Sequence, residues 1–160
     1  MTSAWRIAAP DYATTPDEMM SGEGASRVGG RWNSKGTRLA YLGSSRAQAA
    51  MELLVHLDSA QALKAFSLLQ VDFDESLIVA VDPADLPSDW HSPKMASAVR
   101  SIGDEWVKNE DSAILAVPSA VIKGETNYLY NPAHPDADKV EFGDIEEFSF
   151  DPRVVRAKSP

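Results

Sequence analysis

Three short stretches of the sequence carry residue types that could do chemistry together. Gly29-Gly30-Arg31-Trp32-Asn33 places a guanidinium directly after two glycines, and Tyr41 and Glu52 follow at short intervals. Glycine lets a backbone approach a ligand closely, and arginine grips phosphate with a planar fork of donors that lysine lacks. These residues therefore indicate a site for a substrate that carries a pyrophosphate group.

Glu52 belongs to a segment with helical periodicity. Ser45-Arg46-Ala47-Gln48 has the capping-box pattern of a helix start, and apolar residues continue the helical spacing to Leu57. Gln48, Glu52 and His56 are four residues apart, so we expect them to share one polar stripe. Such a stripe could be a solvent-exposed face of the helix, or it could place the Glu52 carboxylate in an active site. His56 alone is more often a core or surface histidine than a catalyst, and no spacing indicates a metal site.

Short strands and two main helices are expected around these residues. Apolar and β-branched runs predict strands at 5–8, 38–42, 66–73, 77–81, 113–117, 126–130 and 145–150, with a turn joining 66–73 to 77–81. Residues 11–24 contain a proline and two glycines and predict a loop. Ser92-Pro93 predicts the start of the second helix, whose core stripe would be Met95, Val99, Ile102 and Trp106. The prediction is an α+β fold in a single compact domain.

Composition limits the classes of function. The chain has 15 lysines and arginines against 24 aspartates and glutamates, a net charge of −9, whereas nucleic-acid binding needs a basic surface. Direct nucleic-acid binding is therefore not expected. The chain has no cysteine, no export-signal pattern and no apolar run long enough to span a bilayer. We expect a cytoplasmic protein that does not contact the membrane.

The common nucleotide and hydrolase motifs are incomplete. Gly22-Glu23-Gly24-Ala25-Ser26-Arg27 begins like a dinucleotide fingerprint but lacks the third glycine. No Walker A lysine motif, His-Glu-x-x-His or Gly-x-Ser-x-Gly pattern occurs. Rossmann, P-loop, zincin and α/β-hydrolase chemistry are thereby excluded.

Taken together, five segments resemble the RES-domain family. They are Trp5-Arg6-Ile7, the Gly29–Asn33 segment with Tyr41, residues 52–57, residues 117–120 and residues 127–132. The family is named for an arginine, a glutamate and a serine, and the matching positions are Arg31, Glu52 and Ser119. The resemblance implies a RES domain over residues 1–150, with residues 151–160 as a C-terminal tail. Disorder is expected for the basic stretch 153–158 in that tail.

The resemblance implies a fold and an activity. RES-domain proteins are toxins of bacterial two-gene toxin–antitoxin modules, with an ADP-ribosyltransferase-like fold of short strands and flanking helices, and they consume NAD⁺. The implied function is a toxin that transfers ADP-ribose from NAD⁺ to a cellular protein and arrests growth. The alternative is a toxin that depletes NAD⁺ by hydrolysis or phosphorolysis. A non-catalytic binding module is a third reading, which the complete motif disfavours.

The resemblance also implies partners. The usual partner is an antitoxin with an Xre-type helix-turn-helix that covers the active site, and DNA binding would belong to that partner. The acidic charge of this chain agrees with such a division. The protein acceptor of ADP-ribose is the other expected partner.

Catalytic roles follow as expectations for three residues. Cleaving the nicotinamide–ribose bond builds oxocarbenium character on the ribose, which a carboxylate stabilises, and Glu52 would provide it. Arg31 would hold the pyrophosphate, assisted by glycine N–H groups, and Tyr41 would stack on the cationic nicotinamide ring.

Binding roles are expected for three further residues. Ser119 and Asn127 would hydrogen-bond the ribose or the carboxamide of NAD⁺ and fix the reacting geometry. Arg6 would be a second phosphate ligand or part of a structural ion pair. NAD⁺ would be the substrate, and no metal is expected.

Overall fold

A single mixed sheet organises the protein in our computed structural model, which describes residues 1–156. The strands are β1 (Thr2–Ala8), β2 (Ala40–Gly43), β3 (Phe66–Phe73), β4 (Ile78–Ala80), β5 (Ile114–Pro118), β6 (Thr126–Tyr130), β7 (Glu141–Phe142) and β8 (Glu146–Phe148). Their order is β4-β5-β6-β2-β1-β3-β7, and β8 also pairs with β3. The β4–β5 pair is parallel, and the other strand pairs within the described residues are antiparallel.

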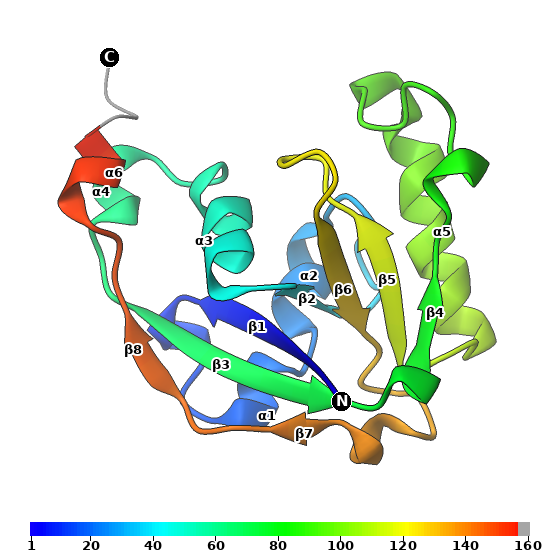
Figure 1. The fold of residues 1–160 in the computed structure, drawn as a ribbon, viewed down its shortest axis with the longest axis horizontal. Helices are drawn as coiled ribbons and strands as arrows, with labels where there is room; N and C mark the ends of the chain where they lie inside the picture. Colours follow the sequence, from blue (N-terminus) through cyan, green and yellow to red (C-terminus); the bar gives the residue numbers. More distant parts are fainter. Residues whose placement is uncertain (157–160) are drawn as a thin grey trace.

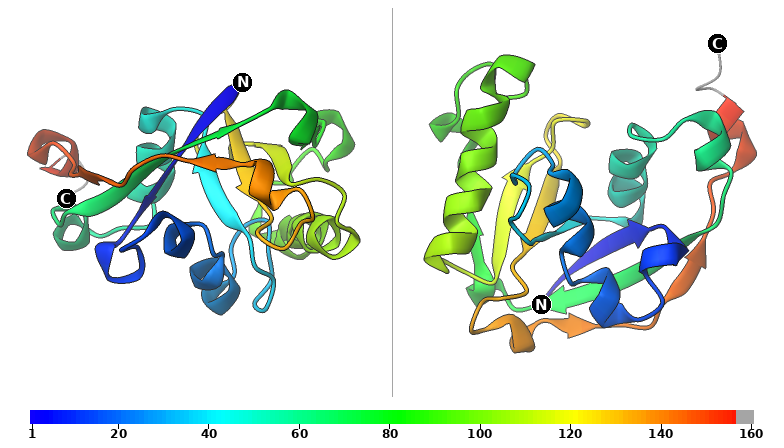
Figure 2. Two further views of the ribbon diagram at one scale, coloured as in Figure 1. Left: turned by 90° about the horizontal axis from the view of Figure 1, so that it is seen from below. Right: turned by 180° about the vertical axis from the view of Figure 1, so that it is seen from behind.

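Short helices surround this sheet. They are α1 (Pro16–Met19), α2 (Glu23–Val28), α3 (Arg46–Leu54), α4 (Ser59–Ala62), α5 (Ala96–Asn109) and α6 (Pro152–Arg156). Five 3₁₀ turns lie at Pro10–Tyr12, Glu75–Leu77, Pro83–Asp85, Pro93–Met95 and Ala137–Lys139. Figure 1 shows α3 and α5 on either side of β5 and β6, and the view from behind in Figure 2 shows α1 and α2 in front of the sheet. The predicted α+β class is confirmed. Within residues 1–156, no helix has the length and apolar character needed to cross a membrane.

The sheet separates the apolar core on one face, which contains Met19 and Met20, from the apolar clusters on the other face, one of which includes residues of α5. Side chains alternate across a strand, so successive residues point to opposite faces. On one face, Leu42 and Tyr130 pack with Met19 and Met20. On the other face, strand residues pack against α5 through Leu115, Val117, Leu129, Val99 and Trp106. The core stripe predicted for the second helix is therefore confirmed.

The strand pairing identifies which polar residues share the α5 face. Asn127 pairs directly with Val117 of β5 and with Gly43 of β2. Directly paired residues point to the same side of a sheet, and Val117 lies in the α5 core. Asn127 therefore faces the side of the sheet where α3 and α5 lie.

The predicted strands at 66–73 and 126–130 are confirmed to the residue. The predicted turn between 66–73 and 77–81 is present as the 3₁₀ turn Glu75–Leu77, which Asp74 caps. The two strands do not pair with each other, however, and β3 and β4 lie near opposite ends of the sheet. The cause is α5, which connects β4 to β5 and brings residues 78–80 into parallel pairing with residues 114–116. A turn signal locates a chain reversal but does not identify the pairing partner.

The helix predicted from Ser45 begins as expected but ends early. Ser45 caps it, since its Oγ accepts the Gln48 N–H at 2.9 Å. The helix ends at Leu54, because a new capping box at Asp58 starts α4. His56 therefore lies beyond the helix and is exposed, so the predicted polar stripe is limited to Gln48 and Glu52.

Two segments predicted to be irregular are partly helical. Within residues 11–24, Pro16 is the first residue of α1 and Thr15 caps that helix, so the proline that indicated a loop starts a helix instead. In the tail, α6 docks through Val155, which is 2% exposed and packs with Leu54 and Ala62. The predicted disorder is therefore wrong for 153–156, and residues 157–158 of that basic stretch lie outside the described residues.

Gly103 on α5 lies against the backbone of Trp32 and provides a stability prediction. A Cβ added there would lie 1.7 Å from the Trp32 carbonyl oxygen. Gly103→Ala should lower the free energy of unfolding by about 1–3 kcal/mol, as overpacked sites do. The matched control is Gly24→Ala on α2, where a Cβ meets nothing within 4 Å and the stability should be unchanged or higher. Thermal unfolding of the two variants measures the difference, and equal melting temperatures would contradict the contact.

Candidate active site

Glu52 lies at the centre of a hydrogen-bonded cluster. Its Oε1 accepts hydrogen bonds from Ser119 Oγ at 2.6 Å, from Asn127 Nδ2 at 2.6 Å and from Gln48 Nε2 at 3.1 Å. Gln48 Nε2 also lies 3.0 Å from Asn127 Oδ1. Among the described residues no group donates to Glu52 Oε2. One carboxylate oxygen is therefore fixed by the protein, and the other remains available to a donor on a ligand.

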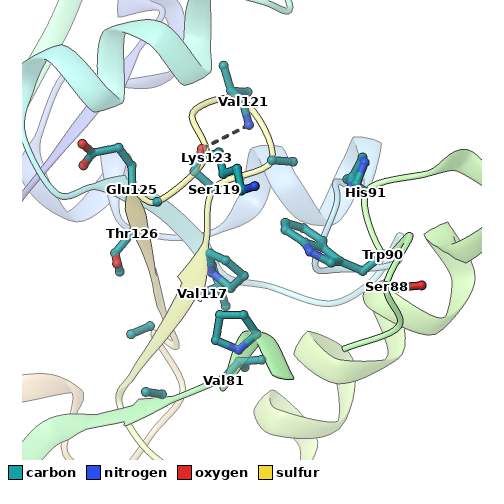
Figure 3. Close-up of a pocket in the computed structure, with 16 residues that line it drawn as sticks. Val81, Ser88, Trp90, His91, Val117, Ser119, Val121, Lys123, Glu125 and Thr126 are labelled. Atoms are coloured by element: carbon teal, nitrogen blue, oxygen red, sulfur yellow. Dashed lines mark hydrogen bonds between the residues drawn. The ribbon is translucent and has the colours of Figure 1, made fainter. Parts of the chain in front are cut away.

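Three separate elements build this cluster. Gln48 and Glu52 come from α3, Asn127 comes from β6, and Ser119 begins the turn between β5 and β6. The backbone turn at Ser119 is ordered by the hydroxyl itself, which accepts the N–H groups of Val121 at 3.1 Å and Ile122 at 3.0 Å. Figure 3 shows the first of these bonds at the mouth of a cavity.

This bonding changes the expected role of Ser119. Its hydroxyl proton is donated to Glu52, and its oxygen already accepts two backbone N–H groups. Asn127 is likewise engaged, through its amide nitrogen with Glu52 and through its amide oxygen with Gln48. In the structure both residues support the Glu52 carboxylate. Their predicted contacts with the ribose or carboxamide stay a prediction.

Arg31 lies at the tip of a tight turn. Gly30 and Asn33 form a β-bridge, with the Gly30 N–H 2.9 Å from the Asn33 carbonyl, and Arg31 and Trp32 form the tip. The Arg31 side chain is exposed. Its guanidinium carbon lies 5.8 Å from the centre of the Trp90 ring, which is cation–π range. The guanidinium is thus oriented by Trp90 and still accessible to an anion.

The two glycines before Arg31 do not present their N–H groups to a ligand. Gly29 N–H donates to the Ala25 carbonyl at 2.8 Å, and Gly30 N–H donates within the turn. The expectation that these N–H groups bind phosphate is therefore not supported. Gly30 has another function, because a Cβ there would lie 2.5 Å from the Tyr41 hydroxyl. The absence of a side chain lets Tyr41 reach the turn.

Tyr41 fixes the base of this turn. Its hydroxyl donates to Asn33 Oδ1 at 2.6 Å and accepts the Trp32 N–H at 3.1 Å. Asn33 is completely buried and donates to three backbone carbonyls, those of Ala25, Ser34 and Thr37. The Tyr41 ring is partly buried against the α5 core. Tyr41 therefore has a structural function in the Arg31 turn, and its stacking on nicotinamide stays a prediction.

The Tyr41 hydroxyl should lose its proton only at unusually high pH. Burial, as the largest cause, raises its pKa from 10.0 to about 12. The folded state binds this proton more tightly than the unfolded state, so the resulting stability is complete below pH 10 and is lost as the pH rises toward 12. Burial also raises the pKa of Tyr130. An ultraviolet absorbance titration should therefore show late tyrosinate formation for both residues, and the Tyr41 contribution near pH 12 should be missing in Tyr41→Phe. A Tyr41→Phe titration identical to that of the wild type would contradict this assignment.

Arg6 points away from Glu52. On β1, Trp5 pairs with Gly43 on the face that holds Asn127, so the next residue points to the opposite face. The guanidinium donates to two backbone carbonyls, those of Met19 at 2.6 Å and Tyr41 at 3.2 Å. Burial lowers its pKa to about 10. Within the described residues Arg6 forms no ion pair, so neither role predicted for it, phosphate ligand or ion-pair partner, is supported.

A cavity of about 810 Å³ adjoins the Glu52 cluster. Its lining includes Val81, Trp90, His91, Val117, Ser119 and Lys123, which Figure 3 shows around the space. Ser119 belongs to both the cavity wall and the cluster, and Trp90 contacts Arg31. The volume is within the range of small-molecule sites, about 300–1,000 Å³. The arrangement provides a carboxylate, a cation and an apolar cavity in one region.

Three contributors to this region were not among the predicted site residues. Gln48 was placed on the polar stripe with Glu52, and that spacing was the signal that could have included it. Trp90 and His91 lie in a segment without a motif, between the turn at 83–85 and α5. No local pattern there indicates that Trp90 meets Arg31.

Comparisons with known proteins give a consistent result. The model of the RES domain family matches residues 3–151. A protein of Sphingobium sp. (strain YBL2) named "Prs ADP-ribosylating toxin" is 36% identical over 158 residues, which cover 97% of this chain and 98% of that protein. A protein of Yersinia enterocolitica named "Toxin Res" is 38% identical over 136 residues, covering 84% of this chain and 89% of that protein.

A solved structure has the same fold. It is the M. tuberculosis MbcT–MbcA toxin–antitoxin complex, with a TM-score of 0.70 and 18% sequence identity, and the match covers 98% of this chain and 87% of the matched one. The family model covers almost all of this chain, and the relatives exceed 30% identity over most of their length. The chain belongs to the RES domain family.

Proposed function

We propose that this protein is the toxin of a toxin–antitoxin module and that it transfers ADP-ribose from NAD⁺ to a cellular protein. The observation that carries the proposal is the convergence of Ser119, Asn127 and Gln48 on one oxygen of Glu52. The names of the relatives, which include an ADP-ribosylating toxin, support the same reaction class.

Glu52 would act on the ribose of NAD⁺. In the reaction the C–N bond between nicotinamide and ribose breaks, and its electron pair leaves with nicotinamide. Positive charge then develops on the ribose, and a fixed carboxylate stabilises that charge without reorganising. Oε2, to which no described group donates, is suited to accept a hydrogen bond from a ribose hydroxyl. The acceptor nucleophile bonds to the same ribose carbon and loses its proton.

Arg31 would hold the pyrophosphate of NAD⁺. Its guanidinium is exposed and lies over Trp90, while Asn33 and Tyr41 fix the turn beneath it. A planar guanidinium binds phosphate oxygens through two parallel hydrogen bonds. The surrounding protein would thus set the position of the dinucleotide relative to Glu52.

The nature of the acceptor decides between transfer and depletion of NAD⁺. A protein acceptor gives ADP-ribosylation, water gives hydrolysis and phosphate gives phosphorolysis. The name of the Sphingobium relative makes Prs the first protein acceptor to test. Action on these substrates would take place in the cytoplasm.

The test uses NAD⁺ labelled in its adenylate phosphate. The protein is incubated with labelled NAD⁺ and either purified Prs or a cell lysate, and the products are separated. Label on a discrete protein band supports the proposal. Free ADP-ribose or its 1″-phosphate without labelled protein would overturn the transferase in favour of the hydrolase or phosphorylase. Unchanged NAD⁺ would overturn all three reactions.

The partner of such a toxin would be an antitoxin that covers the active site, with an Xre-type helix-turn-helix. The solved neighbour is a toxin–antitoxin complex, which supports this part of the proposal. Co-expression with the product of the adjacent gene should restore growth and prevent loss of NAD⁺. Growth arrest that persists with both proteins present would count against an antitoxin in that gene.

A further inference from the structure

The turn that carries Arg31 is also held from α5. Asp104 accepts two hydrogen bonds from Ser34, one from its backbone N–H at 2.8 Å and one from its hydroxyl at 2.6 Å. Ser34 directly follows the buried Asn33 at the base of the turn. Each carboxylate oxygen thus accepts one of the two Ser34 donors, which fixes both the position and the orientation of the chain at Ser34.

The neighbouring helix residue makes a second contact with the same turn. Gly103 lies directly against the carbonyl of Trp32, in contact so close that no side chain fits. Together, Gly103 and Asp104 touch the chain on both sides of Asn33. The turn is therefore clamped between β2, through Tyr41, and α5.

Several groups face the Asp104 carboxylate. Burial alone would raise its pKa, but hydrogen bonds from Ser34 and Thr37 and the positive charge of Arg100 outweigh it, so the pKa is lowered. The carboxylate is therefore ionised near neutral pH. Hydrogen bonds to a charged acceptor are stronger than those between neutral groups, so the ionised Asp104 holds Ser34 firmly.

We infer that Asp104 is a positioning residue for NAD⁺ binding, which acts by holding Ser34 and thereby setting where Arg31 meets the pyrophosphate. The inference rests on the proposed function. Asp104 itself does not touch the reacting atoms. Its effect should therefore pass through Arg31, and misplacement of a binding group by about 1 Å is enough to cost a large factor in rate.

Two substitutions separate geometry from charge. Asp104→Ala removes both acceptors of Ser34. Asp104→Asn keeps the shape, since its amide oxygen accepts one Ser34 donor and its amide nitrogen donates to the hydroxyl oxygen. Asp111, exposed just after α5, provides the matched control as Asp111→Ala.

The kinetic test measures NAD⁺ consumption by the full-length protein. Asp104→Ala should raise the KM for NAD⁺ on the order of tenfold with kcat changed much less. The reason is that Arg31 would bind the pyrophosphate equally in the ground state and in the transition state. Asp104→Asn should recover most of the affinity, and Asp111→Ala should match the wild type. In an Arg31→Ala background, Asp104→Ala should have no further effect on KM. A loss confined to kcat, or an additive loss in that background, would overturn the inference.

Hydrogen exchange provides a readout that does not depend on activity. The Ser34 amide donates to Asp104, so Asp104→Ala should speed exchange across residues 30–37 while the strands keep their protection. Unchanged exchange there would overturn the clamp. If the wild-type protein consumed no NAD⁺, the proposed function would fail and the role in NAD⁺ binding with it, while exchange alone would decide whether Asp104 holds the turn.

Discussion

Glu52→Gln should lower the rate of NAD⁺ cleavage at least about 10²-fold, the cost of removing a fixed group that stabilises transition-state charge. The substitution removes the negative charge and places an amide nitrogen where Oε2 is an acceptor. The charge that develops on the ribose would then have no carboxylate beside it. Growth inhibition on expression should disappear together with turnover.

The fold should survive this substitution. A glutamine oxygen can occupy the place of Oε1 and accept the same bonds from Ser119, Asn127 and Gln48. The matched control is Glu105→Gln at an exposed position of α5, which should retain full activity. Nicotinamide release and thermal unfolding are measured for both variants. Unchanged turnover with a native melting profile in Glu52→Gln would remove Glu52 from the mechanism.

Arg31→Ala should produce the second large effect, a loss of about 10²-fold in kcat/KM for NAD⁺ that is expressed mainly in KM. Charge-assisted hydrogen bonds contribute roughly 1.5–3 kcal/mol each, and a bidentate grip on phosphate makes two of them. Arg31→Lys should restore only part of the loss. Lysine keeps the charge but loses the planar fork and the stacking on Trp90.

Arg27 supplies the control for the arginine variants. It lies on α2 in an exposed ion pair with Glu23, and its removal should leave KM within about twofold of the wild type, because exposed ion pairs contribute little. Initial rates over a range of NAD⁺ concentrations give KM and kcat separately. A KM in Arg31→Ala equal to that in Arg27→Ala would show that Arg31 does not bind the substrate.

Local patterns predicted the parts of the fold whose signals are local. The strands at 66–73 and 126–130 are alternating or continuous apolar runs with clear boundaries, and both form as predicted. The Ser45 cap depends on residues within three positions of each other and is also correct. The family resemblance placed Glu52, Ser119 and Asn127 in one site, which no local pattern indicates, since Ser119 and Asn127 are 67 and 75 positions from Glu52. Their direct hydrogen bonds to Glu52 were not predicted.

The wrong predictions share a physical cause. Gln48 was expected to complete a capping box with Ser45. Its side-chain amide donates to Glu52 and Asn127 instead, so long-range hydrogen bonds of the site replace the local capping bond. Arg6 was expected to be a phosphate ligand or part of an ion pair, yet its face of the sheet depends on the pairing of Trp5 with Gly43, which no local pattern contains. The Arg31–Trp90 contact likewise joins residues that are far apart in the sequence, so no local pattern indicates it.

We propose that the Glu52 carboxylate, held by Ser119, Asn127 and Gln48, promotes cleavage of the nicotinamide–ribose bond. The most direct measurement is nicotinamide released from NAD⁺ by the purified protein, free of antitoxin, with the protein acceptor present. The proposed mechanism predicts release by the wild type in proportion to the ADP-ribose attached to the acceptor, and almost none by Glu52→Gln. Equal release by the two proteins, or no release by the wild type, would contradict it.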